Sequence, residues 1–175
     1  MPLNASSAPR APIRLMQMVP RHRQEGRDGV DNGPAYSLSL TRILSAGRQE
    51  VFAAWTTAAS VQQWMCPEAV SIPLVELEVR VGGAFRVDML IDGAVVTHTG
   101  VYREVTPPKK LVFTWTSQNT LHRETLVTVV LHALGDERTE LRLTQALLPA
   151  EDTTQQHTLG WTQILGHLTT YLKMR

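Results

Sequence analysis

Five polar side chains of this sequence are of types that can do chemistry inside a cavity: His98, Tyr102, Glu124, Gln145 and His157. A histidine titrates near neutral pH, so His98 or His157 could serve as a general acid or base. The alternative is a histidine hydrogen-bonded within a core or at a cavity rim. For Glu124, at the head of an expected strand, a surface ion pair with Arg103 or Arg123 is the simpler interpretation.

Large apolar side chains in the same region repeat with the spacing of strands and helices. Alternate residues of a strand share a face. We expect four such sets to face inward together with an apolar stripe of the last helix: Phe85, Val87 and Met89; Leu111, Phe113 and Trp115; Val127, Val129 and Leu131; Leu141, Leu143 and Gln145; and Trp161, Ile164, Leu165 and Leu168. Aromatic and Met side chains commonly line ligand cavities. Plain core packing is the alternative for each of them. We predict an apolar ligand site formed by Trp64, Phe85, Met89, His98, Phe113, Trp115, Val127, Gln145, His157, Trp161, Leu165 and Leu168.

Other reactive motifs lack the context that they need. Gly82-Gly83 is followed by a strand pattern and not by a helix, so it indicates a bend and not a nucleotide site. No serine stands in a nucleophile-elbow motif. Cys66 is the single cysteine, which excludes an internal disulfide, and no Cys/His spacing is typical of zinc. We predict a small buried thiol at Cys66, no metal site and no cofactor.

The elements that must position these side chains begin near residue 36. Residues 36–44 alternate in polarity as a strand does. A helix is expected over residues 48–57, capped by Ser45. A second short helix, over residues 59–65, ends before Pro67 because proline cannot continue it.

From residue 71 to residue 148 the pattern changes to strands joined by short connections. Turn signals separate them: Gly82-Gly83, Asp92-Gly93, the Pro107-Pro108 pair and Gly135-Asp136. Consecutive strands with such short connections form an antiparallel meander. The expected strands are 71–81, 84–91, 95–105, 111–117, 124–134 and 139–148.

Residues 152–175 repeat apolar side chains at helical spacing, and Asp152 with Gln155 fits a capping box. Gly160 and Gly166 inside this helix each cost roughly 1 kcal/mol relative to Ala, so packing on the sheet must stabilise it. We therefore predict an α+β domain over residues 35–175, with a curved antiparallel sheet of about seven strands around a long C-terminal helix. The helix stripe is narrower than the sheet, which leaves room for a cavity between them.

Composition and charge exclude several classes of function. The net charge is +1, with five Arg against three acidic residues in residues 1–34, so nucleic acid is not an expected partner. Residues 1–34 are rich in Pro and Gly and are expected to be a disordered or partly ordered tail. No secretory signal and no apolar run of about 18 residues is found, so no membrane span is expected. The single cysteine indicates a cytoplasmic setting.

Five segments together resemble a known family: "VFAAWTTAASVQQWMCPE", "VRVGGAFRVDM", "TGVYREVTPPKKLVFTWTS", "ETLVTVVLHALGDERTELRLTQ" and "HTLGWTQILGHLTTYL". They are similar to bacterial proteins that resemble the C-terminal domain of the Hsp90 ATPase activator, in the START-like, Bet v 1-like (SRPBCC) superfamily. The resemblance covers about residues 36–174. It implies a helix-grip fold with an interior pocket for apolar or amphipathic ligands, and residues 99–115 as two adjacent strands of the wall.

Three functions are consistent with this resemblance. The first is binding of a small apolar, aromatic or amphipathic ligand between the sheet and the C-terminal helix. The second is an enzyme of the cyclase or dehydrase type, which would need His98, Tyr102 and His157 to converge in the cavity. The third is a regulator of an Hsp90-type chaperone ATPase. A homodimer is a further expectation on family grounds, with Leu126 and Val130 as apolar contact positions.

Overall fold

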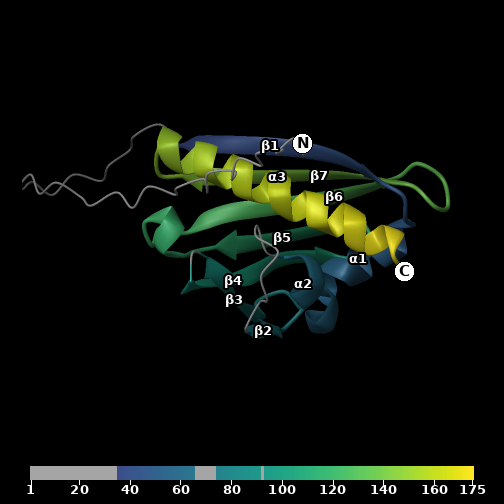
Figure 1. Ribbon diagram of the computed structural model, residues 1–175, viewed down its shortest axis with the longest axis horizontal. Helices are drawn as coiled ribbons and strands as arrows, with labels where there is room; N and C mark the ends of the chain where they lie inside the picture. The colour runs from purple at the N-terminus through teal and green to yellow at the C-terminus, as the bar shows by residue number, and fades with distance from the viewer. Residues whose placement is uncertain (1–34, 66–73, 92) are drawn as a thin grey trace, which may run out of the picture. The chain divides into compact units, whose positions relative to one another are not determined.

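The computed structural model describes residues 35–65, 74–91 and 93–175 (Figure 1). One strand, two short helices, six strands and a long helix follow one another, as the sequence predicts. A short 3₁₀ helix, η1, was not predicted. The bounds are β1 (Tyr36–Leu44), α1 (Arg48–Thr56), α2 (Ala58–Trp64), β2 (Leu74–Leu77), β3 (Ala84–Ile91), β4 (Ala94–Thr106), β5 (Lys110–Trp115), η1 (Gln118–Thr120), β6 (Thr125–Ala133), β7 (Thr139–Leu148) and α3 (Glu151–Lys173).

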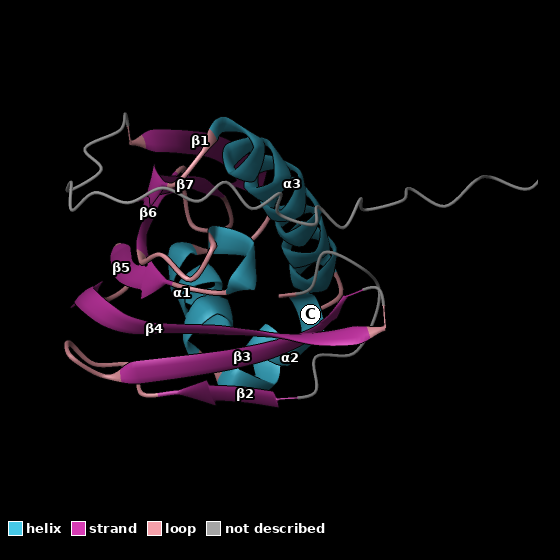
Figure 2. Ribbon diagram, turned by 90° about the vertical axis from the view of Figure 1, so that its left-hand side faces the viewer, coloured by secondary structure: helices cyan, strands magenta, loops and turns pink. Residues whose placement is uncertain are grey.

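All seven strands form one antiparallel sheet in the order β1-β7-β6-β5-β4-β3-β2. The meander from β2 to β7 is extended by β1, which pairs with β7. The sheet bends, and its inner side carries all three helices (Figure 2). Helix α3 packs on β1 and β7, whereas α2 contacts β2 and α1 contacts β6. The α+β helix-grip fold is therefore confirmed, with β4 and β5 side by side as expected for residues 99–115.

The inner face of the sheet is the face that strand alternation predicts. On β3, β5, β6 and β7 the predicted inward residues are all buried. Alternation works because every second side chain of a strand points to the same side. The buried predicted residues include Val87, Leu111, Val129, Leu131, Leu141, Leu143, Ile164, Leu165 and Leu168.

The expected helix caps are wrong in detail. Gly47 and not Ser45 is the N-cap of α1, and Ala150 caps α3, in both cases without a side-chain hydrogen bond. Helix α3 starts at Glu151, so Asp152 lies in its first turn. A carboxylate in the first turn interacts favourably with the positive end of the helix dipole, and this interaction needs no hydrogen bond to a backbone N–H group.

Several expectations fall on residues outside the described ranges. They concern the tail at residues 1–34, the thiol of Cys66, the helix stop at Pro67, the first part of the strand expected at 71–81, and Asp92 of one turn. In the described ranges, no helix has both the length and the apolarity that crossing a bilayer requires. Leu126 and Val130 are half-buried on the outer face of the sheet, and the homodimer stays a prediction.

Candidate functional site

The interior is built around a cluster of aromatic side chains. Each of these rings lies within 6.5 Å of another, centroid to centroid; the closest pairs are Trp55–Trp64 at 4.7 Å and Trp115–Trp161 at 5.3 Å. Such separations are typical of favourable ring contacts. Segments far apart in sequence are therefore held together by one continuous aromatic core. Its members are Trp55, Trp64, Phe85, Tyr102, Phe113, Trp115 and Trp161.

Gly100 on β4 allows two of these rings to meet. It pairs with Phe85 of the neighbouring strand β3, and Trp115 ends strand β5 on its other side. A Cβ atom at position 100 would overlap the Phe85 ring and the backbone oxygen of Thr114. Without that atom, the Phe85 and Trp115 rings approach to 5.8 Å across the glycine. The missing side chain thus shapes one wall of the interior.

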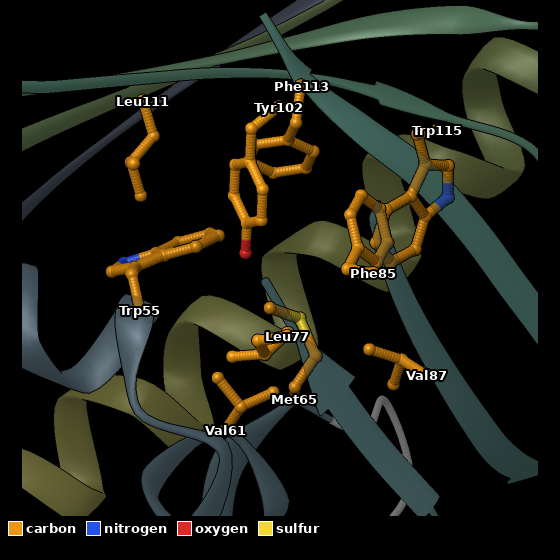
Figure 3. Close-up of a pocket in the computed structure, with 10 residues that line it drawn as sticks. All are labelled: Trp55, Val61, Met65, Leu77, Phe85, Val87, Tyr102, Leu111, Phe113 and Trp115. Atoms are coloured by element: carbon orange, nitrogen blue, oxygen red, sulfur yellow. The ribbon is translucent and has the colours of Figure 1, made fainter. Parts of the chain in front are cut away.

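A pocket opens within this aromatic core, between α1–α2 and strands β2–β5 (Figure 3). Its volume is about 20 Å³. A space of that size holds about one water molecule. No residue of α3 contributes to its wall. The lining residues are Trp55, Val61, Met65, Leu77, Phe85, Val87, Tyr102, Leu111, Phe113 and Trp115.

One polar atom points into this pocket, the hydroxyl oxygen of Tyr102 (Figure 3). The Tyr102 side chain is only 4% exposed, and its hydroxyl has no hydrogen-bond partner among the described residues. Burial raises the pKa of Tyr102 to about 12. The group is therefore an uncharged donor at neutral pH.

Two fully buried side-chain nitrogens in the described part of the chain also lack a partner, Trp55 Nε1 and His98 Nδ1. His98 pairs with Val87 across β3 and β4, and its ring lies 4.8 Å from the Trp115 ring. Burial, and secondly the nearby His157, lower the pKa of His98 to about 4. His98 is thus neutral at pH 7 and lies beside the pocket wall without lining it.

His157 projects from α3 and is half-buried. Its Nδ1 atom lies 2.8 Å from the backbone oxygen of Thr153, which makes Nδ1 the protonated nitrogen. Burial lowers its pKa, too. Tyr102 and His98 are therefore inward on one strand, with His157 close enough to influence His98, but only Tyr102 reaches the pocket.

Beneath α3, by contrast, the buried polar groups form a closed chain of hydrogen bonds. Trp161 Nε1 donates to Gln145 Oε1 at 2.8 Å, and Gln145 Nε2 donates to Thr125 Oγ1 at 2.8 Å. The Thr125 hydroxyl then donates to the backbone oxygen of Trp115 at 2.7 Å. Gln145 and Thr125 are fully buried. These hydrogen bonds connect α3, β7, β6 and β5. Both the Oε1 and the Nε2 atom of Gln145 are engaged in them, so the side chain has little hydrogen-bonding capacity left for a ligand.

The predicted site residues thus divide between two places. Phe85, Phe113 and Trp115 line the pocket. The rest do not line it: Trp64, Met89, His98, Val127 and Gln145 are buried elsewhere in the interior, and His157, Trp161, Leu165 and Leu168 belong to α3. Their part in ligand binding stays a prediction. The expected pairing of Glu124 is found, because Arg103 Nη2 lies 3.5 Å from Glu124 Oε1.

The predicted ligand site did not include seven of the residues that line the pocket: Trp55, Val61, Met65, Leu77, Val87, Leu111 and Tyr102, the last of which was named only as a polar candidate. The first three belong to or directly follow the two short helices after β1, whose apolar residues the sequence displays. The apolar stripes of these two helices therefore indicated that they pack on the sheet. The sequence did not indicate which strands they cover, and in the structure these are β2–β5.

A second hollow, of about 720 Å³, lies where β1 meets α1, the β6–β7 hairpin and the end of α3. Charges of both signs line it, from Glu50, Asp136 and Glu137 and from Arg138 and Arg175. Within the described residues no group of three potential ligands could hold a metal ion. This hollow has neither the apolar wall nor the unpaired buried groups of the aromatic pocket.

Known proteins resemble this chain in sequence and in structure. Residues 45–173 match the family model "Activator of Hsp90 ATPase homolog 1-like protein". No curated protein matches the sequence. Many solved structures do.

A protein from Chromobacterium violaceum is 25% identical with a TM-score of 0.68, over 77% of this chain and 96% of that one. An HSP90 activator from Plasmodium falciparum is 24% identical with a TM-score of 0.64, over 78% and 96%. CalU16 from Micromonospora echinospora is 22% identical with a TM-score of 0.63, over 79% and 76%. The last two likenesses, below 25% identity, concern the fold alone.

Proposed function

The chain belongs to the family of activator of Hsp90 ATPase homolog 1-like proteins, and from that premise we propose that it binds a small apolar or aromatic molecule in the pocket between α1–α2 and β2–β5. The observation that carries the proposal is the composition of the pocket wall. Five of its ten residues are aromatic, and the others are Val, Leu and Met. Ligand sites are typically lined in this way, with few polar groups.

The chemistry of the wall favours binding over catalysis. Among the described residues that line the pocket, Tyr102 is the only one that titrates, and its raised pKa keeps it protonated. General acid–base catalysis works best with groups that titrate near the working pH. His98 and His157, the other members of the catalytic set expected from the sequence, lie outside the wall.

The pocket must widen to accept a ligand, because its volume of about 20 Å³ is that of one water molecule. Two lining side chains suit such a change. Met65 has an unbranched, flexible side chain that adapts to irregular space. Leu77 is half-buried and belongs to β2, a short strand at the edge of the sheet.

Titration with N-phenyl-1-naphthylamine, an uncharged probe that fluoresces in apolar surroundings, tests the proposal. We expect saturable binding by the wild-type protein. Leu77→Phe, which adds bulk to the wall, should weaken binding about tenfold. Val95→Phe, at an exposed position on β4, is the matched control and should leave binding unchanged. Absence of saturable binding, or equal effects of the two variants, would reject the pocket as a ligand site.

Regulation of a chaperone ATPase is the second candidate, favoured by the family match and by the structural likeness to an HSP90 activator. The test is the ATPase rate of an Hsp90-type chaperone from the same cell with and without this protein. A rate that rises with protein concentration and saturates would support regulation. An unchanged rate would remove this candidate and leave the ligand proposal intact.

A further inference from the structure

We propose that the aromatic pocket selects ligands that carry an uncharged acceptor oxygen, such as an aromatic ketone, and that the Tyr102 hydroxyl donates the hydrogen bond that selects them. This inference rests on the proposed ligand-binding function and adds the chemical class of the ligand. It depends on three features of the structure: the placement of the hydroxyl, the lack of a partner for it among the described residues, and the absence of charge on the ten residues that line the pocket.

The Tyr102 ring is held in one position by its neighbours. Its centroid lies 5.8 Å from that of Phe85 and 6.0 Å from that of Phe113, and both rings belong to the adjacent strands. The hydroxyl projects from this support toward the space between Trp55, Met65 and Leu77 (Figure 3). A donor fixed in this way loses little conformational freedom when it binds a ligand.

Within the described residues the Tyr102 hydroxyl has no partner, whereas most of the other interior polar groups are paired. Trp64 Nε1, for example, donates to the backbone oxygen of Ala54 at 3.1 Å, although it lies on the same side of the fold. A buried donor without a partner destabilises the folded state, and an acceptor that reaches it removes that cost. The pocket is therefore most stable when it contains an acceptor atom, either that of a water molecule or that of a ligand.

The wall determines which acceptor is favoured. None of the ten lining residues carries a charge at neutral pH, because Tyr102 stays protonated. An anionic oxygen would lose its favourable hydration, and the ten lining residues offer no cation to compensate for it. The free-energy cost of dehydrating a neutral carbonyl oxygen is much smaller. The aromatic rings around the hydroxyl favour a flat apolar frame for the rest of the ligand. Together these features favour an aromatic carbonyl compound over a fatty acid or a sulfonate.

Two flat tricyclic molecules that differ by one carbonyl group, fluorene and 9-fluorenone, test the inference. Affinities are measured by displacement of N-phenyl-1-naphthylamine. In the wild-type protein we expect 9-fluorenone to bind about tenfold more tightly than fluorene, as one net hydrogen bond provides. In Tyr102→Phe the ratio should fall to about one through loss of 9-fluorenone affinity alone. Tyr36→Phe, on β1 and outside the pocket, should keep the wild-type ratio.

A spectroscopic signal separates a direct hydrogen bond from a change of pocket shape. The carbonyl stretching band of bound 9-fluorenone should shift to lower wavenumber in the wild-type protein and return toward its value in an apolar solvent in Tyr102→Phe. Because Tyr102→Phe breaks no hydrogen bond within the described residues, we expect its melting temperature to stay close to that of the wild type.

Different failures lead to different conclusions. If both tricycles bind the wild-type protein equally, or if Tyr102→Phe keeps the preference, the inference about Tyr102 is wrong and the ligand site stands. If the fluorescent probe binds but neither tricycle displaces it, the ligand class is wrong. If the probe does not bind at all, the proposed function fails together with this inference.

Discussion

The interior has two halves, one beneath α3 and one beneath α1 and α2, and their side chains are packed differently. Beneath α3, side chains from β5, β6 and β7 fill the space, and Trp161, Gln145 and Thr125 satisfy one another. Beneath α1 and α2, a pocket remains, and the Tyr102 hydroxyl and Trp55 Nε1 have no hydrogen-bond partner among the described residues.

This difference indicates where function resides. A filled half with closed hydrogen bonds stabilises the fold, because each buried polar group has its partner. A half with free space and unpaired donors is less stable than it could be, and such local violations are expected at functional sites. We therefore propose that the long helix α3 supports the fold and that the two short helices cover the proposed ligand site. Four predictions follow from this contrast.

We expect the largest loss of stability when Gln145 is replaced. Gln145→Ala leaves Trp161 Nε1 without an acceptor and opens a cavity in the filled half, so we expect the free energy of unfolding to fall by about 3–4 kcal/mol. Tyr102→Phe removes a polar group of the other half that has no partner among the described residues, and should change stability by no more than about 1 kcal/mol. Chemical denaturation measures both. Similar losses in the two variants would contradict the contrast.

Acid sensitivity should come from His98. Its folded-state pKa, about 4, lies below the ordinary 6.5. The unfolded chain therefore binds the proton first, and stability present above pH 6.5 is lost as pH falls toward 4. The maximum loss is about 3 kcal/mol. The lowered pKa of His157 adds a loss of the same sign, whereas the backbone of Val87 and Val96 and, less strongly, Asp88 oppose the shift in the pKa of His98.

Denaturation between pH 7 and pH 4 measures this loss. His98→Phe keeps a ring against Trp115 and should flatten most of the pH dependence, leaving the part due to His157. His132→Phe, at an exposed position of β6, is the control and should follow the wild-type curve. A His98→Phe variant as acid-sensitive as the wild type would refute the assignment.

Glycines in the two halves should respond in opposite directions. Gly100→Ala forces a Cβ atom into the Phe85 ring and the Thr114 carbonyl, so we expect a loss of about 2 kcal/mol and altered aromatic circular dichroism. Gly166 on α3 has open space around a Cβ atom, and Gly166→Ala should stabilise the protein by up to about 1 kcal/mol. Thermal and denaturant unfolding decide the signs, and a tolerated Gly100→Ala would mean that the wall of the pocket adapts.

The smallest effect comes from one added methylene group. Val87→Ile extends a side chain of the pocket wall into free space and should stabilise the protein by up to about 0.8 kcal/mol while weakening probe binding. Val129→Ile adds the same group on β6, where Val129 is 1% exposed, and overpacking there should cost about 1 kcal/mol. Equal signs for the two variants would show that both halves are packed alike.

Much of this architecture was predictable from local pattern. Alternation along Phe85, Val87 and Met89 predicted the inward face of β3, and turn residues separated the strands, because both signals depend only on neighbours in the chain. The helix caps were less predictable. Ser45 has the right chemistry, but α1 begins after Gly47, whose place in the fold leaves no room for a Cβ atom beside the Asp136 carbonyl.

The amino-acid sequence on its own therefore determined the order of the elements, the side of each strand that faces inward, and the membership of the family. Only the tertiary structure decided that the free space lies under α1 and α2, that Gln145 Oε1 accepts a hydrogen bond from Trp161, and that the Tyr102 hydroxyl has no partner among the described residues. The reason is physical: strand and helix periods are properties of adjacent residues, whereas a cavity is the volume left over when side chains from distant segments have packed together.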